Sequence, residues 1–110
     1  GTFCPIADFS LIRRAAELCE QAGVNYKVGN IFSSDMFYDD ANSGMQWAKM
    51  GVLGVEMESA ALYCNAARAG KKALCICTVS DSFLHPEENT TAEERQNSFT
   101  AMMKIALELA

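Results

Sequence analysis

The chain has 110 residues and a net charge of -5, with 50% hydrophobic and 21% charged residues. This composition can bury a core and excludes a disordered chain. The basic residues are scattered, apart from Arg13-Arg14 and Lys71-Lys72, which excludes a basic stripe for nucleic acid. No apolar run approaches the roughly 20 residues of a membrane span, and no signal-peptide pattern is visible, so we expect neither nucleic acid nor a membrane as a partner.

The five cysteines are odd in number and lie within apolar patterns, at positions 4, 19, 64, 75 and 77. This usage favours free, buried thiols in a reducing cytoplasm. Cys75 and Cys77 are two residues apart, but the chain offers no second pair of Cys or His, so packing explains them better than a metal or redox site. The sequence therefore indicates no metal and no organic cofactor.

The first part of the chain alternates between helical and strand patterns. Asp8 or Ser10 can cap a helix whose apolar positions follow a period of 3.6, and Gly23 is placed to end that helix. Residues 26–32 alternate loosely and predict a strand. A polar turn then leads to a short helix over 45–50.

The second part of the chain contains the most apolar segment. A strand is predicted over 52–58, followed by an alanine-rich helix over 59–69 that Gly70 ends. Residues 73–79 are all apolar or β-branched and contain no Gly or Pro. Such a run between helical patterns predicts a strand that is buried on both faces of a parallel sheet.

The chain closes with an irregular segment over 82–89 and a final helix. Residues 90–94 supply a capping box in either of two registers, and the helix carries an apolar stripe that includes Phe99 and Met102. The expected order of elements is therefore α-β-α-β-α-β-α. This order predicts one α/β unit with a parallel sheet.

Acidic side chains end two of the expected strands. Glu56 and Glu58 end one strand and would share a face if it continued, and Asp81 follows the most apolar one. Ligands bind beyond the carboxyl ends of parallel strands, so Asp81 is a candidate for acid/base chemistry, and the alternative is that it only starts a turn or caps the next segment. A carboxylate on an apolar strand must be hydrogen-bonded or functional, because burying it unpaired is costly.

Other polar and aromatic residues allow two interpretations each. Arg95 lies in the first turn of the last helix, where the dipole disfavours a cation, so it either pairs with a carboxylate such as Asp81 or is solvated. Phe37 and Tyr38 could stack on a planar ligand or belong to the core. His85 is the only histidine and lies beside a proline in a loop, which makes a Ser-His-Asp triad improbable.

Several segments together resemble the bacterial hexameric purine nucleoside phosphorylases. They are GVEMESAALY at 54–63, CTVSD at 77–81, TTAEERQ at 90–96, ADF at 7–9 and VGNIFSSDMFY at 28–38. The resemblance implies a three-layer α/β/α fold with a mostly parallel or mixed central sheet. It also implies phosphorolysis of purine nucleosides to free base and (deoxy)ribose 1-phosphate in purine salvage, by a cytoplasmic homohexamer with phosphate as co-substrate.

The same resemblance implies roles for particular residues. Asp81 would be the general acid that protonates the purine at N7, and Arg95 would approach it and assist the proton transfer. Glu58 would hold the ribose hydroxyls, and Phe37 would stack on the base. The implied substrate-binding residues are Val55, Glu56, Met57, Glu58, Ser80, Phe37 and Tyr38. We expect the site of Asp81 to disfavour its anion through desolvation, because the acid must be protonated to donate.

The resemblance covers only the C-terminal half of that family's chain. The glycine-rich turn and arginines of the phosphate site belong to the other half, in agreement with the acidic balance and isolated glycines here. We therefore expect residues 1–110 to form a single partial domain that holds the base and ribose half of the site. The beginning of the sequence also favours a partial domain, because residues 1–9 do not start with Met and include several apolar residues.

Three alternatives to the phosphorylase remain open. A nucleosidase of the same superfamily, acting on methylthioadenosine-type nucleosides, would use water in place of phosphate. Uridine phosphorylases look similar around Glu56 and Glu58 but lack the Ser80-Asp81 pair. The third alternative is an inactive fragment that binds nucleosides without turning them over. The phosphate dependence of base release separates the phosphorylase from the nucleosidase, and calorimetric titration with adenosine, inosine and hypoxanthine separates a binding fragment from an unfolded one.

Overall fold

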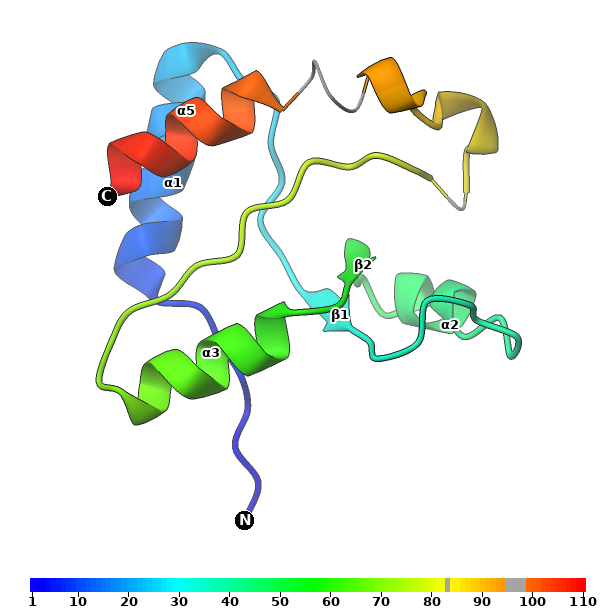
Figure 1. Ribbon diagram of the computed structural model, residues 1–110, viewed down its shortest axis with the longest axis horizontal. Coiled ribbons are helices and arrows are strands. Elements are labelled where there is room, and N and C mark those ends of the chain that lie inside the picture. The colour runs from blue at the N-terminus through cyan, green and yellow to red at the C-terminus, as the bar shows by residue number, and fades with distance from the viewer. Residues whose placement is uncertain (83, 95–98) are drawn as a thin grey trace. The chain divides into compact units, whose positions relative to one another are not determined.

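The computed structural model describes residues 1–82, 84–94 and 99–110. It contains both helices and a small parallel sheet, as expected of an α/β chain (Figure 1). The elements are α1 (Phe9–Ala22), β1 (Ile31–Ser33), α2 (Gly44–Lys49), β2 (Gly54–Glu56), α3 (Ser59–Arg68), the 3₁₀-helix η1 (Pro86–Glu88) and α5 (Thr100–Leu109). The chain divides into two compact units. The first comprises Gly1–Ile12 and Lys27–Cys75, and the second Arg13–Tyr26 and Ile76–Ala110.

Helix α1 begins and ends where local sequence rules place it. Asp8 caps the helix, because its Oδ1 accepts a hydrogen bond from the Leu11 N–H at 3.1 Å. Hydrogen bonds from the Ser10 hydroxyl and the Leu11 N–H lower the pKa of Asp8. Gly23 follows the helix with a φ of 66°, the left-handed conformation of a helix C-terminus. The expected helix is confirmed.

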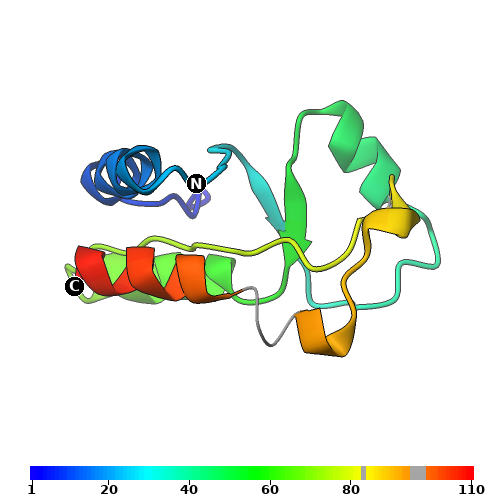
Figure 2. The ribbon, with the colours of Figure 1, turned by 90° about the horizontal axis from the view of Figure 1, so that it is seen from above.

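The first unit is built on the parallel pair of strands β1 and β2. Ile31 pairs with Gly54, and Ser33 pairs with Glu56, and the two arrows lie side by side in Figure 2. Helix α2 connects the strands, and its Trp47 ring stacks on Phe32 with the centroids 4.9 Å apart. Both strands are shorter than the sequence patterns predicted, because only three residues of β1 form pairs with three residues of β2.

Helix α3 starts three residues after β2 and ends at Arg68, and Gly70 follows it with a φ of 65°. This matches the expected helix to within one residue at its end. The hydroxyl of Tyr63, from the middle of α3, accepts a hydrogen bond from the Cys75 N–H at 3.0 Å. The segment that follows α3 is thereby held against the helix.

The strand expected over residues 73–79 is absent, and this prediction was wrong for the structure. Within the described residues, strand structure is confined to β1 and β2, and Figure 1 draws 73–79 as extended chain without an arrow. A strand forms when neighbouring strands satisfy its N–H and C=O groups, and such a ladder does not form here. The backbone N–H of Asp8 donates to the Ala73 carbonyl at 3.0 Å instead. The segment is not buried on both faces either, since Val79 is 74% exposed.

The second unit contains the buried hydrophobic residues of the described chain. Leu18 of α1 and Ile105 of α5 are 7% and 6% exposed. Before α5, a capping box forms at Thr91 and Glu94. The Thr91 N–H donates to the Glu94 carboxylate at 2.7 Å, and the Glu94 N–H donates to the Thr91 hydroxyl at 3.1 Å. The predicted box is confirmed, in the second of its two registers.

None of the five cysteines forms a disulfide, as expected, but the prediction that they are buried was wrong. Cys4 and Cys77 are exposed and the other three are half-buried. No helix in the described parts of the chain has the length and apolar character that a membrane span requires.

Replacing Gly70 with Ala is expected to lower the free energy of unfolding by roughly 1–2 kcal/mol, because a Cβ disfavours the left-handed backbone at this position. Urea unfolding of both forms measures the change. Gly54→Ala is the matched control, because neither glycine has any atom within 4 Å of an added Cβ and only Gly70 has a positive φ. The control is expected to be neutral or slightly stabilising. Equal losses for the two variants would contradict the backbone explanation.

Candidate functional site

Glu56, the last residue of β2, turns its carboxylate toward the start of α3. Its Oε2 accepts hydrogen bonds from the Glu58 N–H at 2.7 Å and from the Ser59 N–H at 2.6 Å. Its Oε1 accepts a further hydrogen bond from the Ser59 hydroxyl. Ser59 is only 3% exposed, the one buried polar residue among those described. The expectation that a carboxylate on this strand must be hydrogen-bonded is confirmed for Glu56.

Ser33 brings the end of β1 into the same group. Its Oγ accepts a hydrogen bond from the Ala60 N–H at 3.3 Å. Burial raises the pKa of Glu56, but hydrogen bonds from the Ser59 hydroxyl, the Glu58 and Ser59 N–H groups and the Ser33 hydroxyl together lower it below its ordinary value. The ends of both strands therefore cap α3 with an ionised carboxylate and a hydroxyl.

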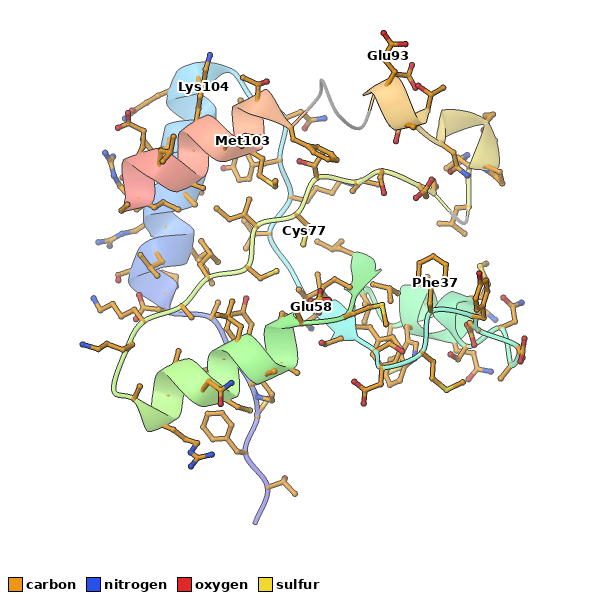
Figure 3. The ribbon with its side chains drawn as sticks, in the orientation of Figure 1. Phe37, Glu58, Cys77, Glu93, Met103 and Lys104 are labelled. Carbon is orange, nitrogen blue, oxygen red and sulfur yellow. The ribbon has the colours of Figure 1, made fainter. Side chains whose placement is uncertain are left out.

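Glu58 has a different environment from Glu56, although the two are only two residues apart. The strand ends at Glu56, so the alternation that would put both carboxylates on one face does not extend to Glu58. Glu58 stands at the N-cap position of α3, yet its side chain makes no capping hydrogen bond. The side chain is exposed, and Figure 3 shows it at the beginning of α3.

Val55 and Met57 flank Glu56 and are partly exposed. Their exposed fractions are 43% and 39%, so each leaves apolar surface accessible.

Phe37 and Tyr38 lie in the loop between β1 and α2. They are 77% and 78% exposed, and their rings meet edge to face with centroids 5.1 Å apart. The core interpretation of these aromatics was therefore wrong, and Figure 3 shows Phe37 projecting from its loop. The next residue, Asp39, fixes the end of the loop by accepting hydrogen bonds from the Ser43 hydroxyl and the Gly44 N–H.

The Ser80-Asp81 pair belongs to the second unit. The Ser80 hydroxyl donates to Oδ2 of Asp81 at 2.9 Å. The Ser80 carbonyl accepts hydrogen bonds from the N–H and the hydroxyl of Thr90, at 2.8 and 2.7 Å, which closes the loop that contains η1. Asp81 is exposed, so the desolvated site that we expected for it is not present. Arg95, its expected partner, lies outside the described residues.

The structure thus gathers part of the expected site in each unit. The first unit carries Val55, Glu56, Met57, Glu58, Phe37 and Tyr38, and the second carries Ser80 and Asp81.

Sequence reasoning missed the part played by Ser33 and Ser59. The sequence did contain a signal, namely Ser59 three residues after Glu56. A capping box has Ser or Thr first and Glu three residues later, and here the order is reversed. Among the described side chains, no group of three or more His, Cys, Asp or Glu could hold a metal ion.

Residues 1–110 match the Phosphorylase superfamily. The chain belongs to this superfamily. It is 52% identical over 108 residues to a purine nucleoside phosphorylase of the DeoD type from Geobacillus sp. (strain WCH70), a match that covers 98% of this chain and 46% of the relative. The DeoD-type enzyme of Clostridium novyi (strain NT) is 51% identical over 109 residues, with coverages of 98% and 46%. The enzyme of Geobacillus kaustophilus (strain HTA426) is 53% identical over 108 residues, with coverages of 98% and 45%.

This phosphorylase-superfamily chain spans about half the length of the curated relatives that it matches. The resemblance noted in the sequence is confirmed at the level of the superfamily. The matched region includes the strand ends and loops on which the site residues lie, because it covers nearly the whole chain.

Proposed function

We propose that this chain supplies the purine- and ribose-binding half of a purine nucleoside phosphorylase. The observation that supports the proposal most directly is the 52% identity to a DeoD-type purine nucleoside phosphorylase along 98% of the chain. The chemistry of the exposed groups agrees with it. A carboxylate at the start of α3, partly exposed apolar side chains and an exposed aromatic pair suit a ligand with a hydroxylated sugar and a planar base.

In the proposed reaction, phosphate attacks C1′ of the nucleoside, the N-glycosidic bond breaks, and its electron pair leaves with the purine. The products are the free base and (deoxy)ribose 1-phosphate. Asp81 donates a proton to N7 of the departing purine, with Arg95 favouring the carboxylate as it forms. Positioned general acids of this kind accelerate reactions by about 10²–10⁴-fold.

The remaining residues bind the substrate in this proposal. Glu58 accepts hydrogen bonds from the ribose hydroxyls, and the partly exposed Met57 packs on the sugar. Phe37 stacks on the base, with Tyr38 beside it and Ser80 close to the ring. The exposure of the two aromatic rings supports their part, because an exposed ring can pack against a ligand.

We further propose that residues 1–110 correspond to the C-terminal half of a three-layer α/β/α domain. The match along 98% of the chain and 46% of the relative supports the assignment to one half of a longer domain. The phosphate-binding residues would then come from the other half of the domain. We propose a homohexamer that acts in purine salvage in the cytoplasm, where five unbridged cysteines are expected.

The proposal is tested by measuring free-base release from inosine and adenosine, with and without phosphate. Two proteins are compared: the purified chain, and a chimera in which residues 1–110 replace the segment that they match in the Geobacillus sp. (strain WCH70) relative. Phosphate-dependent release by the chimera is expected, with little or none from the chain alone.

The other outcomes decide between the alternatives. Release that needs no phosphate would support the nucleosidase. Nucleoside binding without release by the chimera would support an inactive binding fragment. If the chimera melts cooperatively but neither binds nor cleaves a nucleoside, the proposed function is wrong.

A further inference from the structure

Glu58 occupies the N-cap position of α3, but Glu56 accepts the hydrogen bonds that cap this helix. We propose that Glu56 is a positioning residue: it takes over the capping of α3, and so sets the backbone at Glu58 and leaves the Glu58 carboxylate available for the ribose. The capping part rests on the geometry of the first unit, and the ribose part rests on the proposed function. The resemblance implied that Glu56 binds the substrate, whereas in this proposal Glu56 does not contact it.

The hydrogen bonds at the start of α3 carry this inference. The first N–H groups of a helix have no partner within the helix and need an acceptor, which the side chain at the N-cap position often provides. Here Glu58 occupies that position and provides none. The Glu58 and Ser59 N–H groups donate to Glu56 Oε2 at 2.7 and 2.6 Å. The Ala60 N–H donates to the Ser33 hydroxyl at 3.3 Å.

The acceptors come from outside the helix and are themselves fixed. Ser33 and Glu56 are partners in the register of the parallel strands β1 and β2. The Glu56 carboxylate is held from its other side by the hydroxyl of Ser59, which is 3% exposed. Because the Glu58, Ser59 and Ala60 N–H groups already have acceptors, the Glu58 side chain is not needed to cap them.

Electrostatics also favour a capping role for the Glu56 carboxylate. An anion at the N-terminus of a helix is stabilised by the helix dipole, and the ionised Glu56 carboxylate occupies this place with four hydrogen-bond donors around it. Glu58 lies at the same helix end, so its own carboxylate is also tolerated there. The Glu56 carboxylate is therefore hydrogen-bonded within the protein, and the Glu58 carboxylate stays exposed and available to a ligand in this proposal.

The first experiment tests the geometry and needs no activity. Amide resonances of the purified, ¹⁵N-labelled chain are followed by NMR as the pH is lowered. The Glu58 and Ser59 amides are expected to shift together, with a midpoint below the ordinary pKa of glutamate. The Glu56→Gln variant should abolish the transition. Amides that do not respond, or respond equally in the variant, would overturn the capping role.

The second experiment tests whether Glu56 acts through Glu58, in the chimera described above. Glu56→Gln is expected to raise KM for inosine by about tenfold, because small displacements of a binding group are costly. The inhibition constant of free hypoxanthine should change less than about twofold, since only the ribose contact is displaced. Glu108→Gln, an exposed glutamate of α5, is the matched control and should change neither value.

A double-mutant cycle completes the test. Adding Glu56→Gln to Glu58→Ala should produce no further loss of inosine binding, because the residue that Glu56 positions is already gone. Additive losses would mean that Glu56 contacts the substrate itself, and would overturn the positioning role while leaving the proposed function intact. An inactive, cooperatively folding chimera that binds no nucleoside would instead overturn the proposed function and the ribose part, and the NMR titration would still decide the capping part.

Discussion

Replacing Asp81 with Asn in the active chimera is expected to slow phosphorolysis of inosine by about 100-fold or more. Asparagine cannot donate the proton that the purine needs at N7 before it leaves. Stability should change by less than about 0.5 kcal/mol, because Asp81 is exposed and an amide oxygen can still accept the Ser80 hydroxyl hydrogen bond. Steady-state kinetics and thermal melts of the two proteins measure both effects.

A substrate that needs no proton provides the control for Asp81. The base of 7-methylinosine is already cationic, so it can leave without a general acid. The variant should cleave this nucleoside within a few fold of the unsubstituted rate. Loss of activity on both nucleosides would indicate a binding or structural role for Asp81, and an unchanged rate with inosine would exclude it as the acid.

Replacing Glu58 with Ala is expected to weaken the binding of inosine by about 10- to 100-fold. A hydrogen bond to a charged group contributes about 1.5–3 kcal/mol, and each 1.4 kcal/mol corresponds to a factor of ten in affinity. Binding of free hypoxanthine should change little, because the proposed role of this carboxylate is to hold the ribose and not the base. Stability should also change little, since the Glu58 side chain makes no capping hydrogen bond.

Calorimetric titration with the two ligands separates a ribose contact from a general disturbance of the site. A nucleoside that lacks both the 2′- and the 3′-hydroxyl serves as the control, because it offers no hydroxyl at these positions for Glu58 to hold. Its affinity should be nearly the same for both proteins. Equal losses for inosine and hypoxanthine would contradict the proposed ribose contact.

Local rules predicted the helix ends correctly. Asp8 caps α1, Gly23 and Gly70 follow helices in the left-handed conformation, and Thr91 and Glu94 form the capping box. Each of these features depends on residues within four positions of each other. A short stretch of sequence therefore contains both partners of the interaction that determines the structure.

Features that depend on distant partners were predicted less well. The apolar composition of 73–79 predicted a strand, but a strand also needs neighbours to pair with, and those were not encoded in the segment itself. The same limit applied to Glu56 and Glu58. Their spacing predicted two carboxylates on one face of a continuing strand, because the pattern did not show that pairing with β1 ends at Glu56.

The sequence by itself determined the superfamily and the ends of α1 and α3. These depend on motifs and on hydrogen bonds between near neighbours along the chain. Only the tertiary structure decided which carboxylate is hydrogen-bonded within the protein and which is exposed. The reason is that Ser33 and Glu56, 23 positions apart, meet through the parallel pairing of their strands and together cap α3.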